Sequence, residues 1–245
     1  MESEGKRAKL NLVLDELNIN LSDIQRKQME GYVEILMTAS KVMNLTGEKD
    51  VSKLIVRQIY DSLYLMKILK IENEKKVIDL GTGGGLPGMP LKICLPDMEL
   101  SLLDSNNKKI TFLMETVKRL QLENVKYLHG RAEEWGNHSD HREKYDYILC
   151  KAVAEMYLLA ELALPLLKLG GKALFYKGPK GTEEVRRARK ALDVNGGKVS
   201  TVREYVLLSG EKRSIYVIDK IKKTPTGYPR NIDKIKKSYK RDLFS

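Results

Sequence analysis

Apolar residues recur with helical spacing through the first 70 residues of the chain. One run follows the spacing i, i+3, i+4, i+7, at Leu10, Val13, Leu14 and Leu17. Ser22 is a candidate N-cap for a second helix, whose apolar positions continue to Met37, and a third helical pattern occupies 54–69. The N-terminal segment is therefore predicted to be all-helical.

The pattern changes after residue 74, where short apolar runs alternate with helical ones. Strands are predicted at 76–80, 100–104, 125–129, 145–150 and 172–176, and helices at 107–120, 156–168 and 182–192, with a short helix between the first two strands. Strand, helix, strand at this spacing indicates right-handed parallel crossovers. We therefore expect an α/β fold, a mostly parallel sheet with helices on both faces.

Two further strand patterns, at 201–208 and 213–219, are joined by "SGEK" and predict an antiparallel hairpin at one end of the sheet. The chain then divides into three predicted parts. These are a helical extension over 1–71, an α/β domain over 72–220 and a tail over 221–245.

The predicted tail is strongly basic. The chain has 245 residues and a formal charge of +11, and residues 220–245 hold nine Lys/Arg against two Asp, a net charge of +7. Such a cluster favours contact with a polyanion, nucleic acid first, because each neutralised phosphate releases counterions. A tail that is simply solvated remains an alternative. A membrane surface is disfavoured, because 224–244 begins with Pro and Gly and offers no clean apolar helical face.

The remaining composition excludes several classes of protein. The most apolar window, 145–167, is broken by Lys151 and two glutamates, so no membrane span is expected. The two cysteines, Cys94 and Cys150, and the three histidines follow no disulfide or metal-ligand spacing. We expect a cytoplasmic monomer that needs no metal.

The segment "VIDLGTGGGLPGMP", residues 77–90, holds five glycines and two prolines directly after a predicted strand. Glycine at such a turn lets backbone approach a nucleotide-like ligand, because a Cβ would collide with it. Asp104 ends the second predicted strand, 19 residues after Gly85, where a carboxylate can accept hydrogen bonds from two ribose hydroxyls. Together they predict an adenosine-type site, against the alternative that the glycines serve only tight packing.

One ligand class that fits is a dinucleotide. Gly83-x-Gly85-x-x-Gly88 satisfies the dinucleotide fingerprint, and Asp104 would suit NAD. Spacing alone therefore leaves an NAD-dependent oxidoreductase open.

The second class is S-adenosylmethionine (AdoMet). Asp79-x-Gly81-x-Gly83-x-Gly85 satisfies the acidic-x-G-x-G-x-G pattern of AdoMet methyltransferases. This class is favoured because Asp79 can orient water or the ammonium group of the cofactor. The two prolines also crowd the helix that would receive a pyrophosphate, and the terminal hairpin suits a methyltransferase sheet.

These residues resemble the bacterial small-subunit rRNA guanine-N7 methyltransferases, also called glucose-inhibited division protein B. The blocks "DLGTGGGLPGMPL", "LLDSNNKKITFL", "LENVKYLHGRAEEW", "YDYILCKAVAEMYLLAELALPLLKLGG" and "YKG" follow in the order of that family. So do "NLTG" at 44–47, "YDSL" at 60–63 and "TPTGYPR" at 224–230, and the similarity covers nearly the whole chain.

The resemblance implies a class I AdoMet-dependent methyltransferase fold (Rossmann-like) with an N-terminal helical extension. It implies AdoMet as cofactor and N7 of one guanine in small-subunit rRNA as target, so the partner is that rRNA or the small ribosomal subunit. The cofactor contacts that it implies, to which the glycine motif adds Gly83, are Gly81, Leu86, Asp104, Ser105, Asn106, Ala132 and Glu133.

The chain departs from the family at two positions and in its ending, "SYKRDLFS". Lys151 stands in "CKA", where the family has an arginine in an S-R-A-like triplet, and Gln58 stands where the family tends to show histidine. Lysine lacks the planar fork of arginine, so a bidentate contact to the cofactor carboxylate or to RNA would be weakened. Lys151 stays a candidate for both cofactor binding and catalysis. A diverged RNA- or ribosome-binding relative with weak activity remains an alternative function.

Methylation at guanine N7 suits a sequence without an acid–base constellation. N7 carries a free lone pair, so alignment of the reactants suffices and can lower the barrier by roughly 7–11 kcal/mol. Methylation of an exocyclic amine would call for an Asn/Asp-Pro-Pro-aromatic run, which is absent after the fourth strand. Cys150 would suit pyrimidine C5 methylation, but a small buried core residue is the preferred interpretation.

Cations near predicted strand ends are the candidates for holding RNA. Arg213 is the second candidate catalytic residue beside Lys151, and Lys177 and Arg230 are further candidates, each against the alternative of a solvated charge. The basic run 186–190 is interpreted as a solvated helix face. Trp135 is assigned to packing and His129 to a strand end, while Asn44 either caps a helix or enters the site from the extension.

Overall fold

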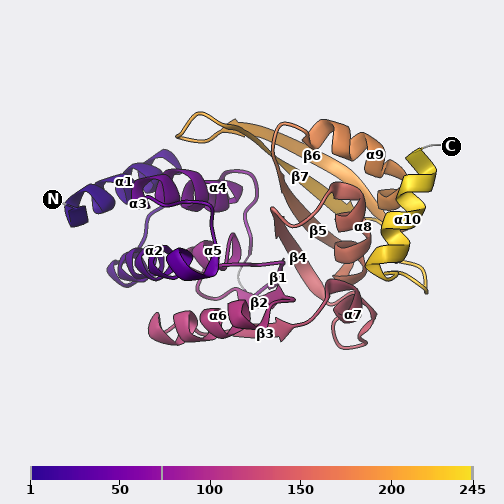
Figure 1. The fold of residues 1–245 in the computed structure, drawn as a ribbon, viewed down its shortest axis with the longest axis horizontal. Helices are drawn as coiled ribbons and strands as arrows, with labels where there is room; N and C mark the ends of the chain where they lie inside the picture. The colour runs from indigo at the N-terminus through magenta and orange to yellow at the C-terminus, as the bar shows by residue number, and fades with distance from the viewer. Residues whose placement is uncertain (1, 73, 244–245) are drawn as a thin grey trace.

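The computed structural model of the chain describes residues 2–72 and 74–243. It confirms the predicted α/β fold, since a seven-stranded sheet carries helices on both faces and follows a helical N-terminal segment (Figure 1). The strands lie in the order β3-β2-β1-β4-β5-β7-β6, and β7 runs antiparallel to both of its neighbours. They are β1 Lys76–Leu80, β2 Glu99–Asp104, β3 Val125–His129, β4 Tyr145–Lys151, β5 Leu167–Lys177, β6 Gly197–Val206 and β7 Lys212–Lys220.

The helices are divided between the two faces of the sheet (Figure 1). On one face lie α5 Gly88–Cys94 and α6 Asn107–Arg119, covered by the extension, and on the other α7 Ala132–Asn137, α8 Met156–Ala163, α9 Gly181–Val194 and α10 Ile232–Leu243. Successive strand residues point to opposite faces, so Val77 joins the core of the first face and Ile78 that of the second. The sheet therefore separates two hydrophobic cores.

Several predicted boundaries were wrong. The strand expected at 201–208 runs from Gly197 to Val206. The helix expected over 156–168 ends at Ala163, and the strand expected at 172 begins at Leu167. Between them lies a 3-10 turn, η3 Leu164–Leu166, that contains Pro165. Proline lacks an N–H and cannot continue the helix, so the apolar run changes from helix to strand at this residue.

The N-terminal segment is helical, as predicted. It comprises α1 Glu2–Glu16, α2 Asp23–Met43, α3 Val51–Lys53, a π-helical stretch η1 Leu54–Ile59, α4 Tyr60–Leu63 and a 3-10 turn η2 Tyr64–Lys67. Ser22 caps α2 in a capping box with Gln25, as predicted from the sequence. Asn44 is the left-handed C-cap of α2, which confirms its capping role.

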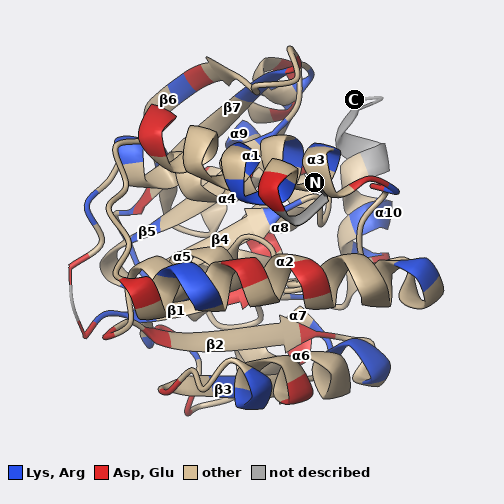
Figure 2. Ribbon diagram, turned by 90° about the vertical axis from the view of Figure 1, so that its left-hand side faces the viewer, with Lys and Arg blue, Asp and Glu red and all other residues tan. Residues whose placement is uncertain are grey.

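The extension and the sheet share a core. Buried side chains of α1 and α2 join those of α5 and α6 in one hydrophobic cluster. Across this contact the Tyr32 hydroxyl donates to the carbonyl of Gly84 at 2.9 Å, and the Gln25 amide donates to the carbonyl of Ile93 at 2.9 Å. The outer face of α2 carries both acidic and basic residues (Figure 2). The extension therefore forms one wall around the glycine segment.

The C-terminal segment packs on the sheet's other helical layer, so the expectation that it lacks an apolar helical face was wrong. Helix α10 lies against α8, where Ile235 is buried beside Leu158 and Leu162. The Tyr239 ring stacks on Tyr157, with ring centroids 3.4 Å apart. One face of the helix carries Ile232, Ile235 and Tyr239. The lysines between them make the segment strongly basic, so its composition alone does not reveal the apolar face. Within residues 2–72 and 74–243, no helix is long and apolar enough to span a bilayer.

Candidate active site

The carboxyl ends of four parallel strands converge at one edge of the sheet. Leu80 pairs with Leu103, Asp104 with His129, and Asp79 with Leu149, so the loops that follow β1 to β4 lie side by side. Ligands of α/β proteins bind at such an edge. The residues implied as cofactor contacts lie at these strand ends or on the segments that follow them, at the edge where β1 and β4 are neighbours in the sheet.

At some positions the glycine segment packs too closely against the protein to admit a side chain, and at one position it does not. A Cβ on Gly85 would lie 2.5 Å from Met89 Cγ, and one on Gly81 would lie 2.9 Å from Val153 Cγ2. Both residues also have positive φ, +98° and +71°. A Cβ on Gly83 would instead have only the Gly81 carbonyl oxygen nearby, at 4.0 Å. The loop is therefore packed against protein except at Gly83, which faces open space.

Asp79 is fully buried beneath this loop. Its Oδ2 accepts hydrogen bonds from the Thr82 hydroxyl at 2.7 Å and from the N–H of Gly88 at 2.9 Å. Burial raises the pKa of Asp79 from 3.8 to about 6, although these two hydrogen bonds lower it. Oδ1 has no hydrogen-bond partner among the described residues. The carboxylate thus ties both ends of the glycine turn together and keeps one acceptor available.

Asp104 holds the loop from the neighbouring strand. Its Oδ2 accepts the N–H of Gly83 at 3.0 Å and its Oδ1 accepts the N–H of Asn106 at 2.9 Å. Asn106 is the N-cap of α6, and the side chains of Ser105 and Asn106 are exposed. Each oxygen of this carboxylate can accept a further hydrogen bond, so the group can accept one from each of two vicinal hydroxyls.

The remaining implied contacts lie on either side of this carboxylate. Ala132 and Glu133 open α7 and are half-buried, directly after the positive-φ turn at Gly130. Leu86 is buried and precedes a cis peptide bond to Pro87. An apolar side chain beside a strand-end carboxylate and an open glycine fits an adenosine group, so the residues present fit AdoMet.

Lys151 ends β4 and is buried against the extension. Its Nζ donates to Gln58 Oε1 at 2.9 Å and lies 3.2 Å from Asp61 Oδ2, with the Ser62 hydroxyl at 3.4 Å. Burial lowers the pKa of Lys151, and the nearby carboxylate of Asp61 opposes that shift. The three donors of this ammonium group are matched by acceptors of the extension, so Lys151 joins the extension to the strand edge.

Sequence reasoning missed the residues that hold Lys151. Asp61 is buried on α4 and also accepts a hydrogen bond from the hydroxyl of Tyr205, on β6. The signal was present in "YDSL", because a carboxylate on an otherwise apolar helical face needs a buried partner. The partner itself lies far along the chain, on a strand end that only the fold brings near.

Arg213 lies beside this network. It pairs with Tyr205 in the hairpin register, and its positive charge lowers the pKa of Lys151. Its Nη1 donates to the carbonyl of Lys212 at 3.0 Å, and the side chain is half-buried. The structure thus brings together the two candidate catalytic residues, with Arg213 the less enclosed of the two.

Two candidates for RNA contact have structural partners instead. Lys177 is buried and pairs with Glu184 at 2.7 Å, while Arg230 pairs with buried Glu161 at 2.7 Å on the far helical layer. Cys150 is buried in the core, where burial raises the pKa of its thiol, as expected for a packing residue.

The minor assignments are consistent with their positions. Trp135 is half-buried and packs edge-on against His141, with ring centroids 4.6 Å apart. His129 is an exposed strand end.

Comparison with known proteins fixes the family. The model of the family described as rRNA small subunit methyltransferase G (GidB) matches residues 25–215. The chain belongs to this family. A ribosomal RNA small subunit methyltransferase G from Alkaliphilus metalliredigens is 43% identical over 216 residues, covering 88% of this chain and 90% of the relative. One from Acetivibrio thermocellus is 40% identical over 240 residues, covering 96% and 98%.

Solved structures agree at the level of the fold. A SAM-dependent methyltransferase from Aquifex aeolicus matches with a TM-score of 0.51 at 19% identity, covering 69% of this chain and 93% of that one. A fibrillarin/Nop5p complex matches with a TM-score of 0.54 at 16% identity, covering 68% and 82%. The predicted class I methyltransferase fold is confirmed. The family is a methyltransferase family, which supports the predicted cofactor AdoMet.

Proposed function

We propose that this protein transfers a methyl group from AdoMet to N7 of a guanine in small-subunit rRNA. The observation that carries the proposal is membership of the rRNA small subunit methyltransferase G family along most of the chain. The strand-edge site supports it, because an open Gly83 lies within hydrogen-bond distance of a strand-end carboxylate, Asp104.

AdoMet, when bound, supplies an electrophilic methyl group on a sulfonium. We propose that Asp104 accepts the ribose hydroxyls, while the glycine turn, with Gly81, Gly83 and Leu86, approaches the rest of the nucleoside. The further contacts proposed are Ser105, Asn106, Ala132 and Glu133, which lie on the two neighbouring loops.

Guanine N7 has a free lone pair, so no residue needs to remove a proton before attack. The task of the protein is alignment of two reactants, which can lower a barrier by roughly 7–11 kcal/mol. We propose that Arg213 contacts the RNA at the edge of the site. We propose that Lys151 acts by fixing the extension as a wall of the site, since its ammonium group faces Asp61 and Gln58.

The proposed partner is the small ribosomal subunit or its rRNA. Because ribosomal subunits are cytoplasmic and the reaction needs no Lewis acid to generate the nucleophile, we propose a cytoplasmic enzyme that works as a monomer without a metal.

The test is transfer of labelled methyl from AdoMet to small subunits that lack the native mark, with naked rRNA in parallel. The product nucleoside is identified by mass spectrometry. Label recovered as 7-methylguanosine is the expected result. Absence of label in a protein that still binds AdoMet would instead favour the diverged RNA-binding function.

The cofactor assignment has its own test. Asp104→Ala is expected to weaken AdoMet binding at least about tenfold, a loss of about 1.4 kcal/mol, because it removes both the proposed ribose acceptor and the partner of Gly83 N–H. Asp97→Ala, at an exposed turn, is the matched control. Equal AdoMet affinity in Asp104→Ala and wild type would contradict the assignment.

A further inference from the structure

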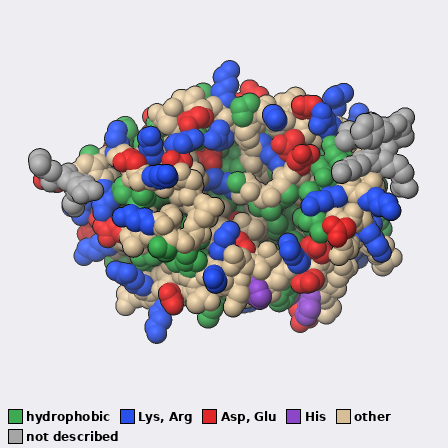
Figure 3. All heavy atoms as spheres, in the orientation of Figure 1, with side chains coloured by type: hydrophobic (Ala, Val, Ile, Leu, Met, Phe, Trp, Pro, Cys, Tyr) green, Lys and Arg blue, Asp and Glu red, His purple; other side chains and the backbone are tan. Residues whose placement is uncertain are grey.

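A groove on the helical layer that bears α8, α9 and α10 lies apart from the strand edge. Its volume is about 1180 Å³, and none of the proposed cofactor contacts lines it. It is lined by residues of α8, by α9 from Val185 onward, by the start of β6 and by α10. Basic and acidic side chains are intermixed on the face shown in Figure 3, so charge alone does not mark a binding surface.

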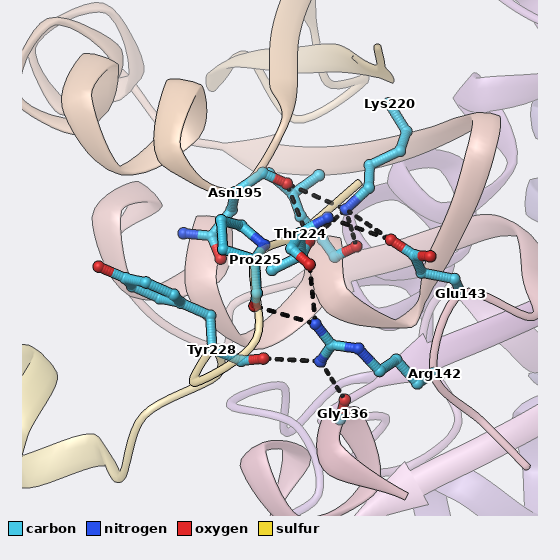
Figure 4. A network of polar contacts seen from close by, with 9 residues as sticks. Gly136, Arg142, Glu143, Asn195, Lys220, Thr224, Pro225 and Tyr228 are labelled. Carbon is cyan, nitrogen blue, oxygen red and sulfur yellow. Dashed lines mark hydrogen bonds and ion pairs between the residues drawn. The ribbon is translucent and has the colours of Figure 1, made fainter. Parts of the chain in front are cut away.

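The groove is a built feature of the fold, because the segment before α10 is held rigidly. Arg142 donates to the carbonyls of Tyr228 at 2.6 Å, Thr224 at 3.0 Å and Pro225 at 3.1 Å (Figure 4). The buried Lys220 donates to the carbonyl of Asn195 at 2.9 Å and also to the Thr224 hydroxyl (Figure 4). These contacts fix the position at which α10 starts.

The negative charges in the groove are neutralised locally. Glu161 at its base is paired with Arg230 through two hydrogen bonds of 2.7 Å, and Asp193 is paired with Lys222 at 2.9 Å. A ligand that enters the groove therefore meets no uncompensated carboxylate from these two residues.

Three positive charges in the groove have no partner within the described part of the chain. Arg186 and Arg189 extend from consecutive turns of α9, and Lys198 from the start of β6. All three side chains are exposed. Guanidinium groups offer planar pairs of donors that suit phosphate oxygens.

The lining also contains apolar and aromatic side chains. Among them are the exposed Ile221 and the stacked pair of Tyr157 and Tyr239. Unpaired arginines over an aromatic and apolar surface are the combination that binds RNA, because phosphates take the charges and bases take the flat rings.

We propose that this groove binds a second segment of the ribosomal RNA substrate, at its phosphodiester backbone. The inference rests on the proposed function, since it assigns to the same substrate a contact remote from the reacting guanine. Two linked contacts bind more tightly than one, because the second forms at a high effective concentration. The groove thus contributes to affinity for the RNA and leaves the chemistry at the strand edge unchanged.

The test compares two triple variants of the full-length protein. The first, Arg186→Gln/Arg189→Gln/Lys198→Gln, removes the unpaired cations of the groove. The second, Lys27→Gln/Lys118→Gln/Arg119→Gln, removes the same charge from exposed positions on α2 and α6, on the opposite layer. Circular dichroism and AdoMet affinity confirm that each variant is folded.

Binding of naked small-subunit rRNA is measured over a range of salt concentrations, and methyl transfer to small subunits gives KM and kcat. The groove variant is expected to bind rRNA at least about tenfold more weakly, with the slope of log K against log salt reduced by about two. Its KM should rise, with kcat within about twofold of wild type, and the control variant should remain close to wild type.

Equal rRNA affinity and salt slope in the two variants would overturn the proposal. So would a raised KM for assembled subunits with unchanged binding of naked rRNA, which would indicate a ribosomal protein as the occupant. If the wild-type protein forms no 7-methylguanosine, the proposed function is wrong, but the rRNA-binding measurement still tests whether the groove binds RNA.

Discussion

The ion pair between Lys151 and Asp61 connects the extension to the carboxyl edge of the sheet. Asp61→Asn leaves Lys151 buried without its anionic partner, so the free energy of unfolding should fall by about 3–5 kcal/mol. Adding Lys151→Met should recover part of this loss, which urea unfolding of the four proteins of the cycle would measure. The half-exposed pair Lys172–Asp219 is the control, where Asp219→Asn should cost less than about 1 kcal/mol. If the losses of unfolding free energy from the Asp61 and Lys151 substitutions simply added, the two residues would not interact as an ion pair.

The protonation of Asp79 gives a second prediction for a single residue. Burial raises its pKa from 3.8 to about 6, so between these values the folded protein binds more protons at Asp79 than the unfolded chain does. The contribution of Asp79 to the free energy of unfolding therefore falls as pH rises. Above the folded pKa the charged, buried Asp79 lowers this free energy by about 3 kcal/mol. Asp79→Asn keeps an acceptor for Thr82 and Gly88 and removes this cost.

Relative to wild type, Asp79→Asn should accordingly gain stability between about pH 4.5 and about pH 7.5, as measured by urea unfolding at both values. If Asp79→Asn and wild type differed in free energy of unfolding by the same amount at both pH values, the Asp79 carboxylate would not be desolvated by burial, contrary to the structure.

Among the elements, the glycine turn separates a packing role from a binding role. Gly85→Ala places a Cβ 2.5 Å from Met89 Cγ and should destabilise the fold strongly. Gly83→Ala meets no such contact, so it should cost only about 1–2 kcal/mol for its positive φ. It should nevertheless weaken AdoMet binding at least about tenfold, which calorimetric titration would detect. Unchanged affinity in Gly83→Ala would place the cofactor elsewhere.

The elements also show what the sequence could predict. Alternating apolar runs and punctuating glycines identified the strands, the hairpin and the loop over Asp79, because these signals are local. The partners of Lys151 depend on a contact between a helix near residue 61 and a strand near residue 151, which no local pattern reports. The packing of α10 was missed for a related reason, since Ile235 lies among lysines whose charge dominates the composition. The groove is formed partly by α10, so it could not be predicted before the position of that helix was known.

At the scale of the whole molecule, the extension is expected to be required for folding. Deletion of residues 1–71 would uncover the apolar side of α5 and α6 and leave Lys151 without Asp61 and Gln58. We expect the shortened chain to show no cooperative thermal transition by circular dichroism and no AdoMet binding, with the full-length chain as reference. A shortened chain that melts cooperatively and binds AdoMet would establish the α/β part as an independent domain.

The contact between Tyr32 and Gly84 also has a consequence for synthesis of the chain. These residues are separated by 52 positions, and at roughly 5–20 residues per second the second follows the first from the ribosome by roughly 3–10 s. During that interval α1 and α2 have emerged while the surface that buries Leu36 has not yet been made. The extension must therefore wait for the α/β part before its apolar face is covered, and a holding chaperone would find its binding segment there.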